Sequence, residues 1–325
     1  MEGPEEHSSL AALLDRALAG DGRSAARLMT LLESDVDATP AIMSRIYPLA
    51  GHAQVIGVTG PPGAGKSSLV DKLAAAFRAQ GKTVGIVAVD PSSPFTGGAL
   101  LGDRIRMQGR FSDPGVFIRS MASRGQPGGL AKASQNVVAL MAATGKDTVI
   151  IETVGVGQEE IDVVRVADTT VVVLVPGLGD AVQTMKAGLL EAADVFAVNK
   201  ADYEGAERLV KDLELMLHLG SSGSAWSPPI VKTIATEGSG VDQLVGSLAG
   251  HFDYLQGSGE YLKRRRRAAV AEIDGVLRGQ LMSAIARRVP AFDVYASQVA
   301  ERKCDPYTAA DRILRESGLT AEGLG

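Results

Sequence analysis

The chain has 325 residues, of which 45% are hydrophobic, and a formal net charge of −5. This length is enough for one large domain with appendages, and the charge does not indicate a nucleic-acid-binding protein. No apolar run approaches the roughly 20 residues that a membrane span needs, and the acidic start MEGPEEHSSL lacks the features of a signal peptide. A single cysteine, Cys304, excludes an internal disulfide and suits a reducing compartment. Together, these features predict a cytoplasmic protein with no membrane or nucleic-acid partner.

Three parts are predicted along the chain. Residues 1–50 carry apolar residues at helical spacing and predict an N-terminal helical extension. Residues 51–250 alternate helix patterns with short β-branched runs, several of them apolar without alternation, as strands buried on both faces are. This order predicts an α/β fold with a mostly parallel, doubly wound sheet, and residues 251–325 predict a C-terminal helical extension. Seven strands are expected, at 55–59, 83–89, 116–120, 148–152, 169–175, 195–199 and 230–234.

The first strong motif follows the first predicted strand. Residues 60–67 read GPPGAGKS, which matches the P-loop pattern G-x-x-x-x-G-K-[ST] between a strand and a helix pattern. Such glycines let backbone N–H groups wrap phosphates at a helix N-terminus, while the lysine approaches the β- and γ-phosphates and the serine hydroxyl ligates Mg²⁺. The alternative, a glycine-rich turn with a surface lysine, does not explain the strand and helix on either side. The expected nucleotide-binding residues are Gly60, Pro61, Pro62, Gly63, Ala64, Gly65, Lys66, Ser67 and Ser68.

A second motif, NKAD at 199–202, indicates the base. It ends a predicted strand and has the N-K-x-D form that is typical of GTPases. The Asp202 carboxylate can accept hydrogen bonds from N1–H and the 2-amino group of guanine, whereas adenine lacks this donor pair and would leave the acid unpaired. The later stretch at 233–236 is expected to contact guanine through a backbone N–H. The base-binding residues expected are Asn199, Lys200, Asp202 and Ala235.

A glutamate at the end of a buried run predicts part of a magnesium site. Most GTPases carry Asp-x-x-Gly after this strand, and here the sequence reads Glu152-x-x-Gly155. Because a glutamate reaches about one bond further than an aspartate, it can bind the metal through a water or orient the attacking water. Gly155 would bring its backbone N–H to the γ-phosphate. The alternative is a solvent-exposed glutamate at a strand end.

The stretch at 90–107, DPSSPFTGGALLGDRIRM, supports a metal role. Asp90 closes the second predicted strand and Asp103 opens a predicted helix, and the glycine and serine content between them suits a loop that orders with ligand. Two arginines follow, and Arg106 is predicted to act as an arginine finger in cis, against the alternative of an ordinary surface arginine. The expected metal ligands are Ser67, Asp90, Asp103 and Glu152, and the expected catalytic residues are Lys66, Arg106 and Glu152.

Together with PGLGDAVQTMK at 176–186 and CDPYTAADRIL at 304–314, these motifs resemble the MeaB/ArgK GTPases over nearly the whole chain. The resemblance implies binding of GTP or GDP with Mg²⁺. It also implies a chaperone role toward an adenosylcobalamin-dependent acyl-CoA mutase, usually methylmalonyl-CoA mutase, and a homodimer formed through the C-terminal helices. Slow intrinsic hydrolysis, accelerated by the partner, is a further implication. The resemblance places a mutase-contacting switch at 175–186, with the polar residues Asp180, Gln183 and Lys186.

Two alternatives stay open. ArgK-type proteins have also been named transport-system (LAO/AO-type) protein kinases, an ATP-dependent activity that the P-loop alone would fit. A kinase needs an acceptor site with a base for the acceptor hydroxyl, and the sequence shows no separate one. The other alternative is a regulatory GTPase switch with another partner. The basic run KRRRR at 263–267 is interpreted as the solvated face of a long helix rather than a nucleic-acid contact.

Overall fold

The computed structural model forms two compact units, residues 1–265 and 266–325. No helix in the part of the chain that the structure describes is both long and apolar enough to cross a membrane. The described residues are 4–34, 37–91, 113–123, 129–153, 165–177, 190–220, 225–289 and 292–318.

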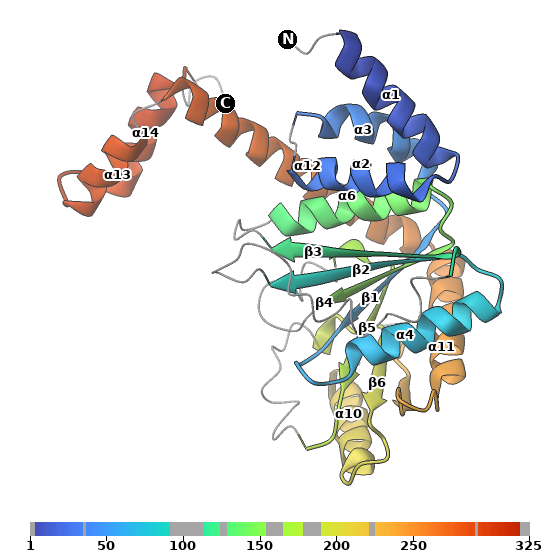
Figure 1. The fold of residues 1–325 in the computed structure, drawn as a ribbon. Helices are drawn as coiled ribbons and strands as arrows, with labels where there is room; N and C mark the ends of the chain where they lie inside the picture. The colour runs from blue at the N-terminus through green and yellow to red at the C-terminus, as the bar shows by residue number, and fades with distance from the viewer. Residues whose placement is uncertain are drawn as a thin grey trace. The chain divides into compact units, whose positions relative to one another are not determined.

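A parallel sheet of seven strands forms the centre of the first unit (Figure 1). The strand order is β3-β2-β4-β1-β5-β6-β7, and every neighbouring pair is parallel. The predicted α/β fold with a doubly wound sheet is therefore confirmed. The strands are β1 (Gln54–Thr59), β2 (Val84–Pro91), β3 (Val116–Ser123), β4 (Thr148–Thr153), β5 (Thr169–Leu174), β6 (Val195–Asn199) and β7 (Ile230–Thr233).

All seven predicted strands occur, with boundaries that shift by at most three residues. Four of them, β1, β4, β5 and β6, are buried along their whole length, which explains why their sequences are apolar without alternation. The largest difference is at β3, which continues to Ser123 because β2 continues to Pro91 beside it and the two strands stay paired to their ends.

Helices cover both faces of the sheet (Figure 1). On one face α4 (Lys66–Ala79) and α11 (Val241–Ser258) share a core with β1 and β5. On the other face α6 (Gly129–Ala143) packs over β2 and β4, and α10 (Ala206–Gly220) packs over β5 and β6. Helices on both sides are what a parallel sheet needs to keep its apolar strands out of water.

Three N-terminal helices extend the second of these faces. Their apolar sides join the core that α6 forms with β2 and β4, and Figure 1 shows them beside α6. Glu33 on α2 also accepts a 2.6 Å hydrogen bond from Arg119 Nε on the edge strand β3. The elements of this segment are α1 (Pro4–Leu18), α2 (Gly22–Ser34), α3 (Thr39–Ile46) and the short 3-10 helix η1 (Tyr47–Leu49).

The described part of the second unit consists of helices. Asp305 caps its last helix by accepting hydrogen bonds from the backbone N–H groups of Tyr307 and Thr308, both at 3.0 Å. With Pro306 at the first helical position, this is the structural reason for the DPYT sequence. The helices are α12 (Glu260–Arg288) from Arg266 onward, α13 (Phe292–Ala300) and α14 (Pro306–Glu316).

The basic run at 263–267 lies in the first turns of α12, and two of its arginines bind buried acids. Arg264 donates from its two terminal nitrogens to both oxygens of Asp194, at 2.7 and 2.8 Å. Arg265 Nε lies 3.5 Å from an oxygen of Asp168. Both acids are about 6% exposed. The interpretation as a solvated face is therefore wrong for these two arginines, because buried carboxylates need cationic partners.

Candidate functional site

The loop from β1 to α4 has the shape of a phosphate cradle. Gly60, Gly63 and Gly65 have φ values of 142°, 76° and 83°, which side-chain-bearing residues rarely adopt. At Gly60 a Cβ atom would also lie only 2.1 Å from the carbonyl oxygen of Val173. The loop then enters α4 at Lys66, so the backbone N–H groups of a helix N-terminus line the concave side.

Lys66 supplies the positive charge of this cradle. Its side chain folds back over the loop, where Nζ donates to the carbonyl oxygens of Gly60 at 2.7 Å and Pro61 at 3.0 Å. The residue is only 5% exposed, so these carbonyls provide the hydrogen bonds that a buried ammonium group requires. The predicted surface-lysine alternative does not fit this geometry. A cationic donor over a glycine turn fits the β- and γ-phosphates of a nucleotide.

Ser67 and Glu152 meet beside the cradle. Ser67 Oγ donates to Glu152 Oε1 at 2.5 Å, and the two residues are 8% and 2% exposed. The strand register explains why the two side chains are close. Glu152 on β4 pairs with Val58 near the end of β1, and the P-loop that leads to Ser67 follows β1. The alternative of a solvent-exposed glutamate is therefore wrong. A serine hydroxyl and a carboxylate are hard oxygen donors of the kind that Mg²⁺ prefers, so the residues fit the predicted metal.

The predicted ligand Asp90 lies at the same edge of the sheet, as far as its backbone shows. On β2, Ala88 pairs with Glu152 of β4, which places the backbone of Asp90 two residues beyond the level of Glu152. Its side chain and residues 92–112 are outside the described part. Other predicted site residues also lie outside the described residues, namely Asp103, Arg106, Gly155, Asp180, Gln183 and Lys186.

Asn199 ties the P-loop to the stretch after β7. Its Nδ2 donates to the carbonyl oxygen of Ala64 at 2.8 Å, and its Oδ1 accepts from Ala235 N at 3.0 Å and Thr233 Oγ1 at 3.2 Å. The contact is close enough that a Cβ on Gly65 would lie 2.4 Å from Nδ2. Asn199 therefore holds two segments that the sequence predicts to bind nucleotide at a fixed distance from each other. The Ala235 N–H donates to Asn199 within this arrangement.

Lys200 and Asp202 follow on the turn after β6. Lys200 adopts a left-handed backbone conformation with φ of 55°, and Asp202 is exposed. Ala201 N donates to the carbonyl oxygen of Thr233 at 3.1 Å, so this turn is fastened to the end of β7. The P-loop, Glu152 and the N-K-x-D motif thus meet at the carboxyl edge of the sheet, where open α/β sheets bind ligands.

Sequence reasoning missed the threonine hydroxyls that brace this edge. Thr153 Oγ1 donates to Thr59 Oγ1 at 3.2 Å, joining the ends of β4 and β1, and both residues are fully buried. Thr233 braces Asn199 in the same way. A single threonine at a strand end has no distinctive sequence pattern, so only the pairing of the strands reveals these contacts.

Comparisons with known proteins identify the family of the chain. The sequence profile of one family, methylmalonyl-CoA mutase-associated GTPase MeaB, matches residues 25–289. A Pyrococcus abyssi protein that carries a GTPase name is 49% identical over 311 residues, covering 94% of this chain and 95% of its own. GTPase ArgK of Escherichia coli is 34% identical over 271 residues, covering 81% and 82%.

Two further matches concern fold and assembly. The crystal structure of an LAO/AO transport system kinase superimposes with a TM-score of 0.71 at 25% identity, covering 97% of this chain and 98% of that one. The fused isobutyryl-CoA mutase of Cupriavidus metallidurans contains a segment 40% identical over 205 residues, which covers 62% of this chain and 19% of the mutase. On the family match and the P-loop geometry, the chain is a GTP hydrolase that belongs to the family of methylmalonyl-CoA mutase-associated GTPases, MeaB.

Proposed function

We propose that this GTPase requires Mg²⁺ and is a chaperone for an adenosylcobalamin-dependent acyl-CoA mutase, gating cofactor loading and protecting the mutase. The observation that carries the proposal is the Cupriavidus metallidurans protein, in which a segment 40% identical to this chain is part of a fused isobutyryl-CoA mutase. A relative that shares one polypeptide with a mutase is evidence that the two modules work together. Methylmalonyl-CoA mutase is the first candidate client, since the family description names it.

In this proposal the described residues have separate roles in nucleotide binding. The P-loop backbone and Lys66 hold the phosphates, and Ser67 and Glu152 would hold the magnesium ion, directly or through water. When bound, Mg²⁺ neutralises negative charge on the β- and γ-phosphates. Asp202, on a turn fastened to β7, is placed to read the edge of guanine. Asn199 holds the P-loop, which binds the phosphates, against the stretch after β7, which binds the base.

Residues outside the described part complete the proposal through the family resemblance. We assign Asp90 and Asp103 to the metal site or its waters, and Arg106 to the transferring phosphate. The backbone of Gly155 is assigned to the γ-phosphate. Contact with the mutase is assigned to the polar residues of the switch at 175–186, namely Asp180, Gln183 and Lys186. Since Val156 stands where Ras-type enzymes carry a water-positioning glutamine, intrinsic hydrolysis should be slow until the mutase completes the site.

The test is a hydrolysis assay with GTP or ATP, alone and with purified methylmalonyl-CoA mutase or isobutyryl-CoA mutase. GTP-specific turnover that rises several-fold with one mutase supports the proposal and names the client. The Lys66→Ala variant mixed with the same mutase should show no rise, which controls for contaminating hydrolases. GTP turnover that neither mutase changes would contradict the chaperone role and leave a regulatory switch with another partner.

A kinase is the second candidate, because the LAO/AO transport system kinase shares the fold with a TM-score of 0.71. This candidate requires ATP and an acceptor protein. The same assay separates it, since preferential ATP use together with a phosphorylated acceptor would favour the kinase. The N-K-x-D turn beside the P-loop favours guanine and therefore the GTPase chaperone.

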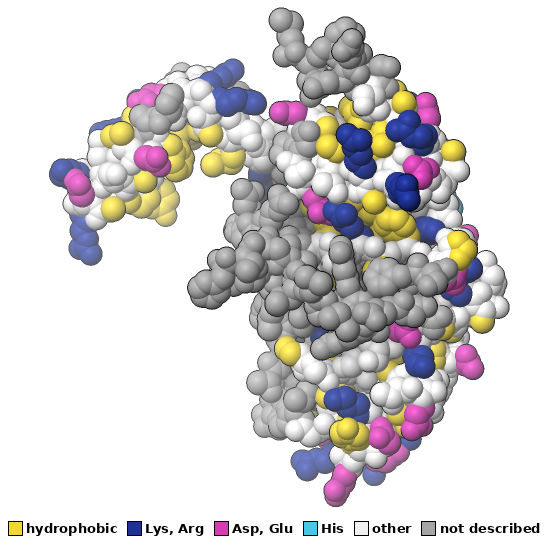
Figure 2. All heavy atoms as spheres, viewed as in Figure 1, with side chains coloured by type: hydrophobic (Ala, Val, Ile, Leu, Met, Phe, Trp, Pro, Cys, Tyr) yellow, Lys and Arg dark blue, Asp and Glu magenta, His cyan; other side chains and the backbone are white. Residues whose placement is uncertain are grey.

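A homodimer through the C-terminal unit is part of the proposal. This unit is about the size at which a single core becomes marginal, and its described part buries few apolar side chains. One face of α12 carries exposed apolar residues at helical spacing, from Val270 (61% exposed) to Leu281 (47% exposed). Figure 2 shows hydrophobic side chains gathered on one side of this unit. The buried apolar residues of its described part are Ile285, Val289, Ala309 and Ile313.

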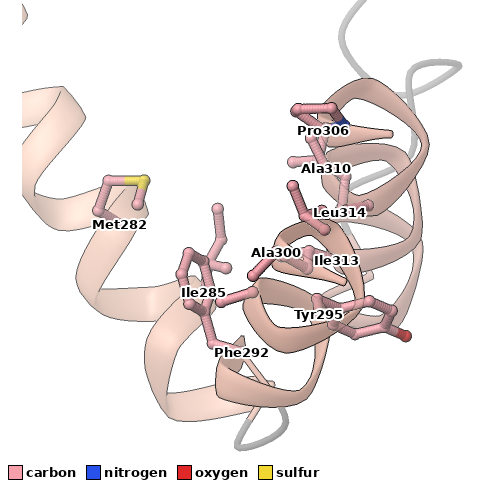
Figure 3. Close-up of a pocket in the computed structure, with 12 residues that line it drawn as sticks. Met282, Ile285, Phe292, Tyr295, Ala300, Pro306, Ala310, Ile313 and Leu314 are labelled. Atoms are coloured by element: carbon pink, nitrogen blue, oxygen red, sulfur yellow. The ribbon is translucent and has the colours of Figure 1, made fainter. Parts of the chain in front are cut away.

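An apolar groove adds to this exposed surface. It has a volume of about 600 Å³, and Met282 and Ile285 of α12 lie across it from Ile313 and Leu314 of α14 (Figure 3). Phe292 on α13, 43% exposed, lines the same groove. Contiguous apolar surface of this kind is typical of a protein–protein interface. A second copy of the chain, which carries the same apolar helix face, is the occupant that we propose.

The dimer is tested by measuring molar mass with sedimentation or light scattering. The double variant Leu277→Glu and Leu281→Glu should shift the mass from that of a dimer to that of a monomer. Leu219→Glu on α10, at a leucine that is 79% exposed, is the matched control and should leave the mass unchanged. A wild-type protein that is monomeric at micromolar concentration would contradict this part of the proposal.

A further inference from the structure

An exposed aromatic ring lies beside the base-reading turn. Tyr203 is 57% exposed, and the ammonium nitrogen of Lys200 lies 5.8 Å from the centroid of its ring. The backbone N–H of Tyr203 donates to the carbonyl oxygen of Lys200 at 2.9 Å, which closes the turn that brings the two side chains together. A single exposed tyrosine needs no explanation by itself, but this ring contacts a residue of the N-K-x-D motif.

The backbone of Lys200 is held in an unusual position. In the described part of the chain, Lys200 and Arg302 are the non-glycine residues with positive φ. Neighbours on both sides hold Lys200 there, because Asn199 is bound to Ala64 of the P-loop and Ala201 is bound to Thr233 at the end of β7. The position of the Lys200 backbone relative to the phosphate cradle is therefore fixed, while its four-carbon side chain can still rotate.

We propose that Tyr203 is a positioning residue for the guanine base. A cation over an aromatic face is attracted to it, so the ring restrains the ammonium group and with it the apolar stem of Lys200. Asp202 reads the edge of the base, and the stem of the neighbouring lysine is placed to cover the face of the base while its charge stays in water. Restraining the stem before the nucleotide binds lowers the entropic cost of binding. This inference rests on the proposed assignment of residues 199–202 to guanine.

The expected effect is modest and specific. A cation–π contact at an exposed site corresponds to a two- to fivefold change in dissociation constant, which is about 0.5–1 kcal/mol. The change should be the same for GDP and for inosine diphosphate, which lacks the 2-amino group, since covering the face of the base does not depend on that group. A substitution of Asp202 would instead change the ratio of the dissociation constants for GDP and inosine diphosphate.

The experiment measures dissociation constants of GDP, inosine diphosphate and ADP for the full-length chain. Tyr203→Leu should weaken binding of GDP and inosine diphosphate equally, by two- to fivefold, and Tyr203→Phe should bind like the wild type because its ring is retained. In the presence of Lys200→Met, Tyr203→Leu should have no further effect, as a double-mutant cycle requires for two residues that act through one contact. Tyr47→Leu in η1, at a tyrosine that is 53% exposed, is the matched control.

Three results would overturn the inference while leaving guanine binding intact. The first is a Tyr203→Leu variant that binds GDP with wild-type affinity. The second is an effect of Tyr203→Leu that adds fully to that of Lys200→Met, and the third is a loss of affinity in Tyr47→Leu as large as in Tyr203→Leu. A wild-type chain that binds ADP as tightly as GDP is a different failure, because it removes the assignment of the motif to guanine and the inference with it.

Discussion

Ser67 on α4 and Glu152 on β4 are joined by a 2.5 Å hydrogen bond although 85 positions separate them in the sequence. The serine follows the P-loop lysine, and the glutamate stands where most GTPases carry an aspartate. The longer side chain reaches from the end of β4 to the first turn of α4. Both oxygens lie in a buried wall next to the phosphate cradle, so two ligands that the sequence assigned separately to magnesium lie at one point.

The Glu152→Gln variant tests the role of this carboxylate. The amide oxygen can still accept from Ser67, so the free energy of unfolding should change by less than about 1 kcal/mol. Loss of the negative charge should lower GTP hydrolysis at least about tenfold and raise the Mg²⁺ concentration needed for half-maximal activity. A Mg²⁺ titration of the hydrolysis rate measures both effects, and an unchanged Mg²⁺ requirement would contradict the assignment of Glu152 to the metal.

Lys66→Ala removes the cation that is bound over the P-loop by Gly60 and Pro61. Hydrogen bonds to charged groups contribute about 1.5–3 kcal/mol each, so the affinity for GDP should fall about 10- to 100-fold. Titration with GDP measures the change. Lys72→Ala on the same helix is the matched control and should bind GDP as the wild type does. Equal loss in both variants would indicate a general effect on α4 rather than a phosphate contact.

Asp202→Asn tests the choice of base. The amide cannot accept hydrogen bonds from both the N1–H and the 2-amino group of guanine, so the preference for GDP over ADP should fall about tenfold or more. Competition of GDP and ADP for the same site measures this ratio. Asp242→Asn, at an exposed acid in the first turn of α11, is the control. Unchanged guanine selectivity in Asp202→Asn would refute the base assignment.

Arg264→Ala tests the anchor at the start of α12. The variant leaves Asp194, which is 6% exposed, without the guanidinium that binds both of its oxygens. Breaking such a pair should lower the free energy of unfolding by about 2–3 kcal/mol, less than for a fully buried pair because Arg264 is 37% exposed. Arg278→Ala, which breaks a solvent-exposed pair on the same helix, should change it by less than about 0.5 kcal/mol. Urea unfolding compares the two variants.

The two buried acids should contribute oppositely to the pH dependence of stability. Burial raises the pKa of Asp194, but His251 and Arg264 outweigh it and leave this pKa below its usual value. For Asp168 burial outweighs Arg265 and the other hydrogen bonds, so its pKa is raised. Asp194 therefore stabilises the fold above the unfolded pKa of about 3.9 and loses this contribution as the pH falls through its folded pKa. Ionised Asp168 destabilises the fold at neutral pH, and this penalty fades as the pH falls.

Asparagine variants measured by urea unfolding between pH 7 and pH 4 test these directions. Asp194→Asn should be less stable than the wild type at pH 7, by about 1–3 kcal/mol, and the difference should persist to about pH 4 because the folded pKa is low. Asp168→Asn should be at least as stable as the wild type at pH 7, and any gain should shrink toward pH 4. A larger loss for Asp168→Asn than for Asp194→Asn at pH 7 would contradict both directions.

Much of the site was predictable because its parts are local in sequence. A strand that is buried on both faces must be apolar along its length, so β1, β4, β5 and β6 were recognisable from their residues alone. The glycines at 60, 63 and 65 are required by the backbone of a phosphate-binding turn, so the P-loop was equally recognisable. The DPYT sequence likewise predicts a helix start, because Asp305 and Pro306 act within a single turn.

The interpretation of the basic run failed for a physical reason that no local pattern contains. Whether an arginine is solvated depends on which residues pack against it. The acids that bind Arg264 and Arg265 stand directly before β6 and β5, far away in the sequence. The sequence by itself determined the strands, the cradle and the order of the motifs. Only the tertiary structure decided that Ser67 faces Glu152, that Asn199 joins the P-loop to β7, and that α12 starts on buried carboxylates. These contacts follow from which strands are neighbours in the sheet, and strand order is set by the packing of the whole domain rather than by any one segment.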